Sequence, residues 1–157
     1  MHDDHAPGKN HYWRLLIMTV VSFISMYILM YAMVDRLENI YPSFNQLYMA
    51  GLMTAPMVAI EIALMTVMYE NTRWNVVILV IAGIAAIVFF MAIRQQAAID
   101  DSEFLKSMIP HHAGAILMCN EASIGDSQIQ ELCKGIIAGQ QSEIDLMKAT
   151  LSRLEQK

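Results

Sequence analysis

The chain has 157 residues, of which 56% are hydrophobic and only 16% are charged, and its mean hydropathy is +0.41. A soluble globular protein is roughly one-quarter charged, so this composition disfavours a purely soluble globule and, still more, a disordered chain. The net charge of −5 lacks the basic footprint of a nucleic-acid-binding protein. Two cysteines are too few for a disulfide-dense secreted scaffold. We therefore expect a membrane protein that contacts lipid and no nucleic acid.

Three apolar stretches follow a polar segment at residues 1–14, and they cover residues 15–34, 47–69 and 76–93. The first has no charged residue, and at about 1.5 Å per residue it is long enough to cross a hydrocarbon core of roughly 30 Å. A signal peptide would have a shorter apolar stretch and a small-residue cleavage site, so we expect a retained span. The links are short, which predicts three transmembrane helices packed as sequential antiparallel neighbours.

Residues 94–157 are predicted to form an extramembrane hairpin of two antiparallel helices. Asp100 or Asp101 can cap the first helix, and Glu103 is placed to complete a capping box. This helix should run to about residue 123, and Gly125-Asp126-Ser127 should break the chain before the second helix. The fold class is therefore all-α. The apolar seam of the second helix is predicted to contain Ile129, Leu132, Cys133, Ile136, Gln140, Ile144, Met147, Leu151 and Leu154.

Basic residues at the ends of the first span favour an N-terminus on the cytoplasmic side. Lys9 and Arg14 precede this span, whereas Arg36 follows it, and the first span usually dominates orientation. Three crossings would then place the hairpin on the other side of the membrane. We expect a bacterial inner membrane protein with a periplasmic C-terminal hairpin.

One face of the first hairpin helix carries side chains that bind metals. At about 100° per residue, Met108, His111, His112, Met118 and Cys119 fall within a stripe roughly 120° wide. Thioethers and thiolates select Cu(I), and imidazole suits copper, zinc or nickel. We therefore predict a metal site, for which imidazole leaves copper, zinc and nickel open. If the ion is copper, the thioethers favour Cu(I) over Cu(II). The competing interpretation is that each methionine is an ordinary core residue.

The second hairpin helix adds further candidate ligands when the hairpin is folded about residues 125–126. Met108 then lies near Glu143, His112 lies near Gln140, and Met147 lies about one turn beyond Glu143. These side chains could form one cluster with His111.

Two features of the hairpin leave alternatives open. Cys119 lies level with Cys133, which allows either a disulfide in an oxidising compartment or a two-thiolate metal pair. Pro110 lacks a backbone donor, so it either kinks the helix and exposes the Lys106 carbonyl or marks the start of the helix.

Residues 100–153 resemble the domain of unknown function 305 family, a ferritin-like helical group associated with copper. The resemblance rests on two segments, Asp101-Ser-Glu-Phe-Leu-Lys-Ser-Met108-Ile-Pro-His111-His112-Ala-Gly-Ala-Ile-Leu-Met118 and Ile137-Ala-Gly-Gln140-Gln141-Ser-Glu143-Ile-Asp-Leu-Met147. It implies copper binding in the cell envelope through Met108, His111, His112, Met118 and Met147. The chain also resembles the membrane-anchored members. Fuller members carry two histidine–methionine units in four helices, whereas this chain has one, so a four-helix bundle would require a homodimer.

Methionines also line the predicted spans. Those of the first span lie at helical spacing, at Met26, Met30 and Met33. Those of the second span should share a face about 80° wide with a carboxylate, and this set is Met57, Glu61, Met65 and Met68. Such stripes could pass Cu(I) between thioether sites, although packing is the favoured interpretation.

Glu61 differs from these methionines because an ionisable group near mid-membrane is costly and is by default functional or paired. We expect it to be protonated, hydrogen-bonded to Tyr27 or Tyr31, or turned toward another protomer.

These observations predict an integral membrane protein that binds copper and either sequesters it, buffers it or hands it to a copper-handling partner. One alternative is a subunit of an oligomeric transport or efflux pathway that uses the membrane methionines and Glu61. Another is a structural membrane protein without a metal. We expect no enzymatic activity, because the tail lacks the Glu-x-x-His motif of di-iron bundles and the chain shows no nucleophile triad.

Overall fold

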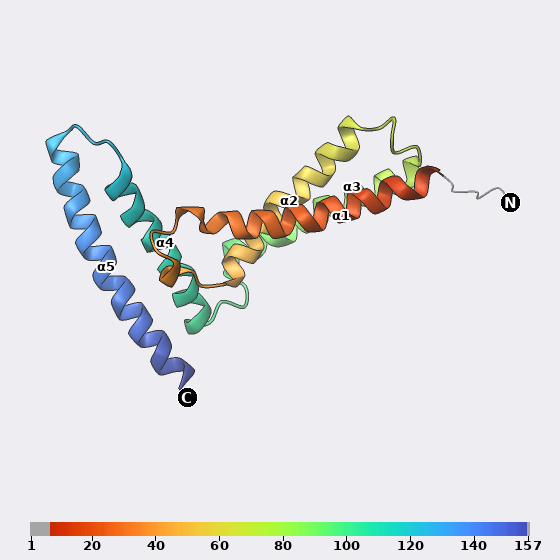
Figure 1. The fold of residues 1–157 in the computed structure, drawn as a ribbon. Helices are drawn as coiled ribbons and strands as arrows, with labels where there is room; N and C mark the ends of the chain where they lie inside the picture. The colour runs from red at the N-terminus through yellow and green to blue at the C-terminus, as the bar shows by residue number, and fades with distance from the viewer. Residues whose placement is uncertain (1–6, 157) are drawn as a thin grey trace. The chain divides into compact units, whose positions relative to one another are not determined.

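The computed structural model describes residues 7–156, in which every regular element is a helix (Figure 1). The α-helices are α1 (Pro7–Leu29), α2 (Phe44–Leu64), α3 (Thr72–Gln95), α4 (Asp101–Glu121) and α5 (Ser127–Glu155). Two short 3-10 helices, η1 (Met30–Met33) and η2 (Leu37–Asn39), follow α1. The predicted all-α class is confirmed. Of the polar segment 1–14, residues 1–6 lie outside the described part, and α1 begins at Pro7.

Three helices are long and apolar enough to cross a membrane, and they cover His11–Met33, Phe44–Leu64 and Thr72–Gln95. They correspond to the three predicted spans and are followed by the two helices of the tail. The contacts divide the chain into two compact units. The three-helix unit contains α1 and residues 47–97, and the hairpin unit contains residues 30–46 and the described residues from 98 onward.

The second span ends earlier than its hydropathy predicts. α2 stops at Leu64 rather than at Tyr69, because the chain turns and the Met65 carbonyl accepts the N–H groups of Met68 and Tyr69 at 2.9 and 3.3 Å. Tyr69 is thereby buried in the three-helix unit. Asn71 then caps α3 with its side-chain oxygen.

This early end corrects the predicted methionine stripe. Met65 directly follows the end of α2 and still donates its N–H to the Glu61 carbonyl at 3.0 Å. Met68 lies in the turn, so the stripe does not extend to it on the helix. The stripe of the first span is also interrupted, because Met30 and Met33 belong to the 3-10 helix η1. Met26 lies on α1 in the three-helix unit, whereas Met30 and Met33 belong to the hairpin unit.

The three-helix unit packs around one apolar cluster of buried residues, which consists of Leu15, Val58, Ile62, Tyr69 and Ala82. Gly51 on α2 allows a close approach of α3. A Cβ atom at this position would lie 2.5 Å from the ring of Phe89, so a larger residue would force that ring to move.

The hairpin unit begins at well-formed helix caps. The Asp100 carboxylate accepts the Glu103 N–H at 2.8 Å, and Asp126 caps α5, as the break at residues 125–127 predicts. α4 runs through Pro110, so the alternative in which the helix starts there is wrong. Proline cannot donate to the Lys106 carbonyl, which therefore lacks its usual intrahelical partner.

The seam between α4 and α5 is shorter than its apolar spacing suggests. The core contains Ile109, Ala113, Ile116, Ile144, Met147 and Leu151. Ile129 and Leu132, which were expected on the seam, are 48% and 61% exposed. α4 ends at Glu121, so the first turn of α5 has no helix opposite it.

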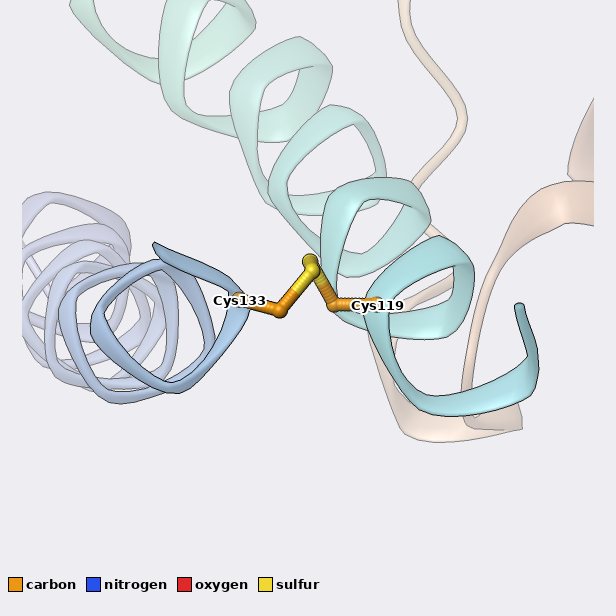
Figure 2. Close-up of a disulfide and its surroundings, with 2 residues drawn as sticks. All are labelled: Cys119 and Cys133. Carbon is orange, nitrogen blue, oxygen red and sulfur yellow. A yellow bond between two sulfur atoms is a disulfide. The ribbon is translucent and has the colours of Figure 1, made fainter. Parts of the chain in front are cut away.

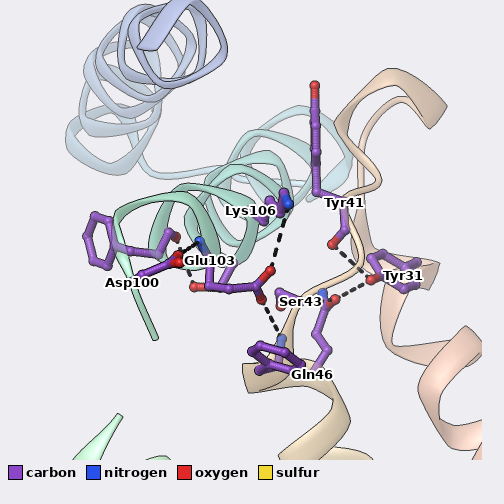
Figure 3. A network of polar contacts seen from close by, with 10 residues as sticks. Tyr31, Tyr41, Ser43, Gln46, Asp100, Glu103 and Lys106 are labelled. Atoms are coloured by element: carbon purple, nitrogen blue, oxygen red, sulfur yellow. Dashed lines mark hydrogen bonds and ion pairs between the residues drawn. The ribbon is translucent and has the colours of Figure 1, made fainter. Parts of the chain in front are cut away.

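The segment 30–46 packs against α4, a relationship that the sequence pattern does not reveal (Figure 3). The Glu103 carboxylate accepts the Phe44 N–H at 2.9 Å and lies 3.7 Å from Lys106 Nζ, instead of completing the predicted capping box. Asn45 hydrogen-bonds to Ser107 at 3.2 Å. Gly114 lets the segment approach closely, since a Cβ there would touch the Met33 carbonyl at 3.5 Å.

Candidate metal centre

His112 lies at the centre of the hairpin seam. Its side chain projects from α4 and is buried, with 8% of the residue exposed. Its Nδ1 atom lies 2.9 Å from the Met108 carbonyl, one turn earlier on the same helix. Its Nε2 atom lies 2.7 Å from the Glu143 carboxylate on α5. The two helices of the hairpin therefore meet through this imidazole.

This geometry leaves one nitrogen of His112 for a metal. Both ring nitrogens face oxygen acceptors, so the ring donates both hydrogen bonds only when it is doubly protonated. The Met108 carbonyl fixes the proton on Nδ1, an arrangement that commonly orients metal-binding histidines. Nε2 can then bind a metal if the Glu143 carboxylate, whose side chain is 57% exposed, turns aside or joins the ligands.

Two methionines lie one helical turn from this pair along the hairpin, Met108 before His112 on α4 and Met147 after Glu143 on α5. Met147 is buried in the core of the hairpin, and Met108 packs against the same core. The sequence predicts that His112 lies beside Gln140, but in the structure it lies opposite Glu143. Gln140 is half-buried on α5. The structure thus brings Met108, His112, Glu143 and Met147 to one part of the seam.

Two other candidates of the α4 stripe lie at the surface. His111 is exposed, and the centre of its ring lies 6.1 Å from that of His112. Met118 is 53% exposed. A stripe about 120° wide is broader than the contact line with α5, so its edge residues do not enter the core. His111 is near enough to His112 to approach the same ion from the solvent side.

Cys119 and Cys133 form a disulfide that joins α4 to α5 (Figure 2). Their Cα atoms are 5.3 Å apart, a separation typical of disulfides. Of the two alternatives left open by the sequence, the structure contains the disulfide. In this state neither sulfur is a thiolate, so neither can serve as a thiolate ligand.

Within residues 7–156, no group of three or more His, Cys, Asp or Glu side chains is placed to hold a metal ion. A site in the hairpin would therefore depend on thioether ligands in addition to His112 and Glu143. Zinc and other borderline metals usually bind four nitrogen, oxygen or thiolate ligands, whereas thioethers select Cu(I). This donor set fits copper(I) better than zinc.

Glu61 has a different partner from those expected. The Tyr69 hydroxyl donates to its carboxylate at 3.4 Å, whereas Tyr31 belongs to the hairpin unit and donates to the Tyr41 carbonyl at 2.9 Å and to Gln46. Burial raises the pKa of Tyr69 above its ordinary value, the Glu61 carboxylate raises it further, and the Arg14 charge acts in the opposite direction. The phenol therefore remains a donor near neutral pH.

Tyr69 also connects Glu61 to a polar cluster at the end of the three-helix unit. Its ring centre lies 5.4 Å from that of Tyr12. The Tyr12 hydroxyl donates to Asn75 at 2.7 Å, and the Asn75 amide donates to the Tyr69 carbonyl at 2.7 Å. Sequence reasoning missed this cluster because Tyr69 was assigned to the helix. The turn residues Asn71 and Asn75 were the available signal.

Comparison with known proteins supports the family resemblance of the C-terminal tail. The family described as a domain of unknown function (DUF305) matches residues 90–151. An uncharacterized protein of Acanthamoeba polyphaga mimivirus is 33% identical over 140 residues, which cover 87% of this chain and 90% of that protein. No solved structure matches the chain. The family match includes α4 and most of α5, and the viral relative extends the similarity over most of the chain. The chain belongs to the DUF305 family.

Proposed function

We propose that the protein is an integral membrane protein that binds copper in its C-terminal hairpin. The observation that carries this proposal is the position of His112, whose Nε2 atom faces Glu143 across the α4–α5 seam at 2.7 Å. The surrounding core supplies the thioethers of Met108 and Met147. Imidazole and thioether together favour copper, and thioethers favour its Cu(I) state.

His112 and Met147 would form the buried part of this site, with Met108 beside them. Glu143 would either leave Nε2 or supply an oxygen ligand. Three additional candidate ligands lie toward the solvent side of the hairpin, namely His111, Gln140 and Met118. Copper would supply no bond-making chemistry in this proposal, because the protein is proposed to hold the ion rather than to turn over a substrate.

The location is proposed from the disulfide and the three apolar helices. A disulfide persists in an oxidising compartment, which favours a hairpin outside the cytoplasm. Three crossings then put the N-terminal end of α1 in the cytoplasm, in agreement with the basic residues around the first span. A bacterial inner membrane with a periplasmic hairpin meets both conditions.

We favour sequestration, buffering or delivery to a copper-handling partner over transport through the membrane. The transport alternative needs a continuous methionine path, but Met68 lies in the turn beyond the end of α2. The exposed apolar residues Ile129 and Leu132 on α5 leave surface on which a second hairpin could pack to form a four-helix homodimer.

Copper loading of the purified full-length protein tests the proposal. The protein is loaded anaerobically with Cu(I), using ascorbate so that the disulfide is preserved, and the copper content is measured after desalting. We expect near-stoichiometric copper in the wild type and its loss in the double variant His111→Ala/His112→Ala. His11→Ala, a histidine substitution on α1, is the matched control and should retain copper.

Single variants then assign the roles of the two adjacent histidines. His112→Ala should weaken Cu(I) binding at least tenfold in a competition with a Cu(I) chelator, because it removes the buried nitrogen. His111→Ala should weaken it less. If the double variant retains copper with its helices intact, the site lies elsewhere. If the wild type binds none, the protein is a helical scaffold and the proposal is wrong.

A further inference from the structure

The three-helix unit contains a cavity of about 460 Å³ that is lined by all three apolar helices. This volume lies within the range of pockets that hold small molecules. Small residues on two of the helices leave the space, namely Ala55 on α2 and Ala82 and Ala85 on α3. Val20 and other apolar residues of α1 form the remaining wall. We call this cavity the membrane groove.

The chemistry of the membrane groove selects a hydrocarbon chain. Two threonines line it, but Thr19 donates to the Leu15 carbonyl and Thr54 donates to the Ala50 carbonyl, each at 2.8 Å within its own helix. Their hydroxyl protons are therefore used, and they present little polarity to an occupant. A polar ligand would lose its hydrogen bonds to water on entering this cavity.

One end of the membrane groove is polar, and this end carries the features of a membrane interface. Tyr12 lines the cavity, and its hydroxyl donates to Asn75 and to the Asn71 carbonyl. The two tryptophans of the chain, Trp13 and Trp74, lie at this end and are 63% and 59% exposed. Exposed tryptophans at the ends of spans are typical of the headgroup region of a bilayer.

Two cations lie at the same level. Arg14 follows Tyr12 by two residues on α1, and its charge acts on the Tyr69 phenol. Arg73 lies in the first turn of α3, two residues after Asn71, whose carbonyl accepts from Tyr12. Both arginines are exposed. The acidic residues at this end are Glu70 in the turn and Glu61, which accepts from Tyr69 on the inner side of the cluster.

We propose that the membrane groove holds one acyl chain of an anionic phospholipid, with the phosphate of its headgroup at Arg14 and Arg73. The apolar walls accommodate the chain, the tryptophans mark the depth of the headgroup, and the arginines match its charge. This binding site is independent of the copper site proposed in the hairpin.

The experiment counts the lipids that the full-length protein retains. The protein is reconstituted in vesicles of equal parts phosphatidylcholine and phosphatidylglycerol with identical acyl chains, then released in mild detergent for native mass spectrometry. We expect one retained phosphatidylglycerol per chain. Val20→Phe should abolish retention by filling the membrane groove. Val21→Phe is the matched control, because Val21 is its neighbour on α1, is similarly exposed and does not line the cavity.

A second pair of substitutions tests the cavity wall formed by α3, so that the proposal can still be tested if Val20→Phe does not fold. Ala85→Phe on α3 should also lose the lipid, whereas Ile84→Phe, which points away from the cavity lining, should keep it. Circular dichroism establishes that the helices are retained. Equal lipid retention by Val20→Phe and Val21→Phe, or by the α3 pair, would overturn the proposal. Loss of a dimer in Val20→Phe without loss of lipid would assign the cavity to a second copy of the chain and would also overturn it.

The charge of the headgroup is tested separately. Arg14→Gln/Arg73→Gln should reduce the preference for phosphatidylglycerol over phosphatidylcholine by about fivefold for each arginine. One cation near an anionic bilayer surface strengthens binding by about this factor. Arg94→Gln, at the other end of α3, should leave the preference unchanged. An unchanged preference in the double variant, or an equal loss in Arg94→Gln, would reject the proposed headgroup position.

Discussion

The Nε2 atom of His112 lies 2.7 Å from the carboxylate of Glu143, so the two hairpin helices meet at a nitrogen that can hold either a proton or a metal ion. The other nitrogen is occupied by the Met108 carbonyl. A metal that binds Nε2 must therefore displace the Glu143 carboxylate from this nitrogen or share it as a ligand.

The disulfide between Cys119 and Cys133 should stabilise the hairpin without taking part in copper binding. The cysteines are 14 residues apart, and closing a loop of this size contributes roughly 3 kcal/mol by restricting the unfolded chain. Cys119→Ser/Cys133→Ser should therefore lower the protection of α5 amides in hydrogen exchange, which reports local opening.

Reduced wild-type protein is the control for the serine variant, because it lacks the bond but keeps both sulfurs. The two samples should lose similar protection. Copper content measured with the disulfide intact should equal that of the double serine variant. A variant that folds but loses copper would indicate that the sulfurs act as ligands.

Local patterns predicted those elements that depend on local physics. Long apolar runs identified the three helices that are apolar enough to cross a membrane, and the residues around Asp126 identified the break and the cap between α4 and α5. Helical counting brought Cys119 level with Cys133 because a short connection leaves the hairpin little choice of register. The same counting was less successful for His112, where an offset of about one turn changes its partner from Gln140 to Glu143.

Contacts between distant segments were not predictable in this way. Glu103 has the spacing of a capping-box residue, but its carboxylate accepts the N–H of Phe44, which is 59 positions away. Tyr69 has the hydropathy of a span residue, but it lies in a turn and donates to Glu61. In each case a polar side chain satisfied a group that only the folded chain brings near, and tertiary contacts overrode local preference.

The contact between Glu103 and Phe44 predicts a measurable link between α4 and the start of α2. The carboxylate accepts the first N–H of α2, a group at a helix N-terminus that side chains commonly cap. Glu103→Ala should therefore destabilise this helix end by about 1 kcal/mol, the typical cost of a lost cap. Hydrogen exchange at the Phe44 amide measures the effect directly.

Glu103→Gln separates the hydrogen bond from the charge. Its amide oxygen can still accept the Phe44 N–H, whereas its attraction to Lys106 is lost. We expect the Phe44 amide to remain largely protected in Glu103→Gln and to exchange faster in Glu103→Ala. Equal protection in wild type and Glu103→Ala would show that this carboxylate does not cap α2 in solution.

The packing of the hairpin core predicts that substitutions at two nearby aliphatic residues of α5 change hairpin stability by very different amounts. Ile144 is fully buried in the seam with α4, whereas Leu146 is 67% exposed. Ile144→Ala should lower hairpin stability by about 2–5 kcal/mol, because it removes buried methyl groups and leaves a cavity. Leu146→Ala should change it by less than about 0.5 kcal/mol, as expected for a surface substitution. Denaturant-dependent hydrogen exchange of α5 amides gives both values on the full-length protein. Comparable losses in the two variants would mean that the Leu146 face is also buried in solution, as it would be if a second hairpin covered it.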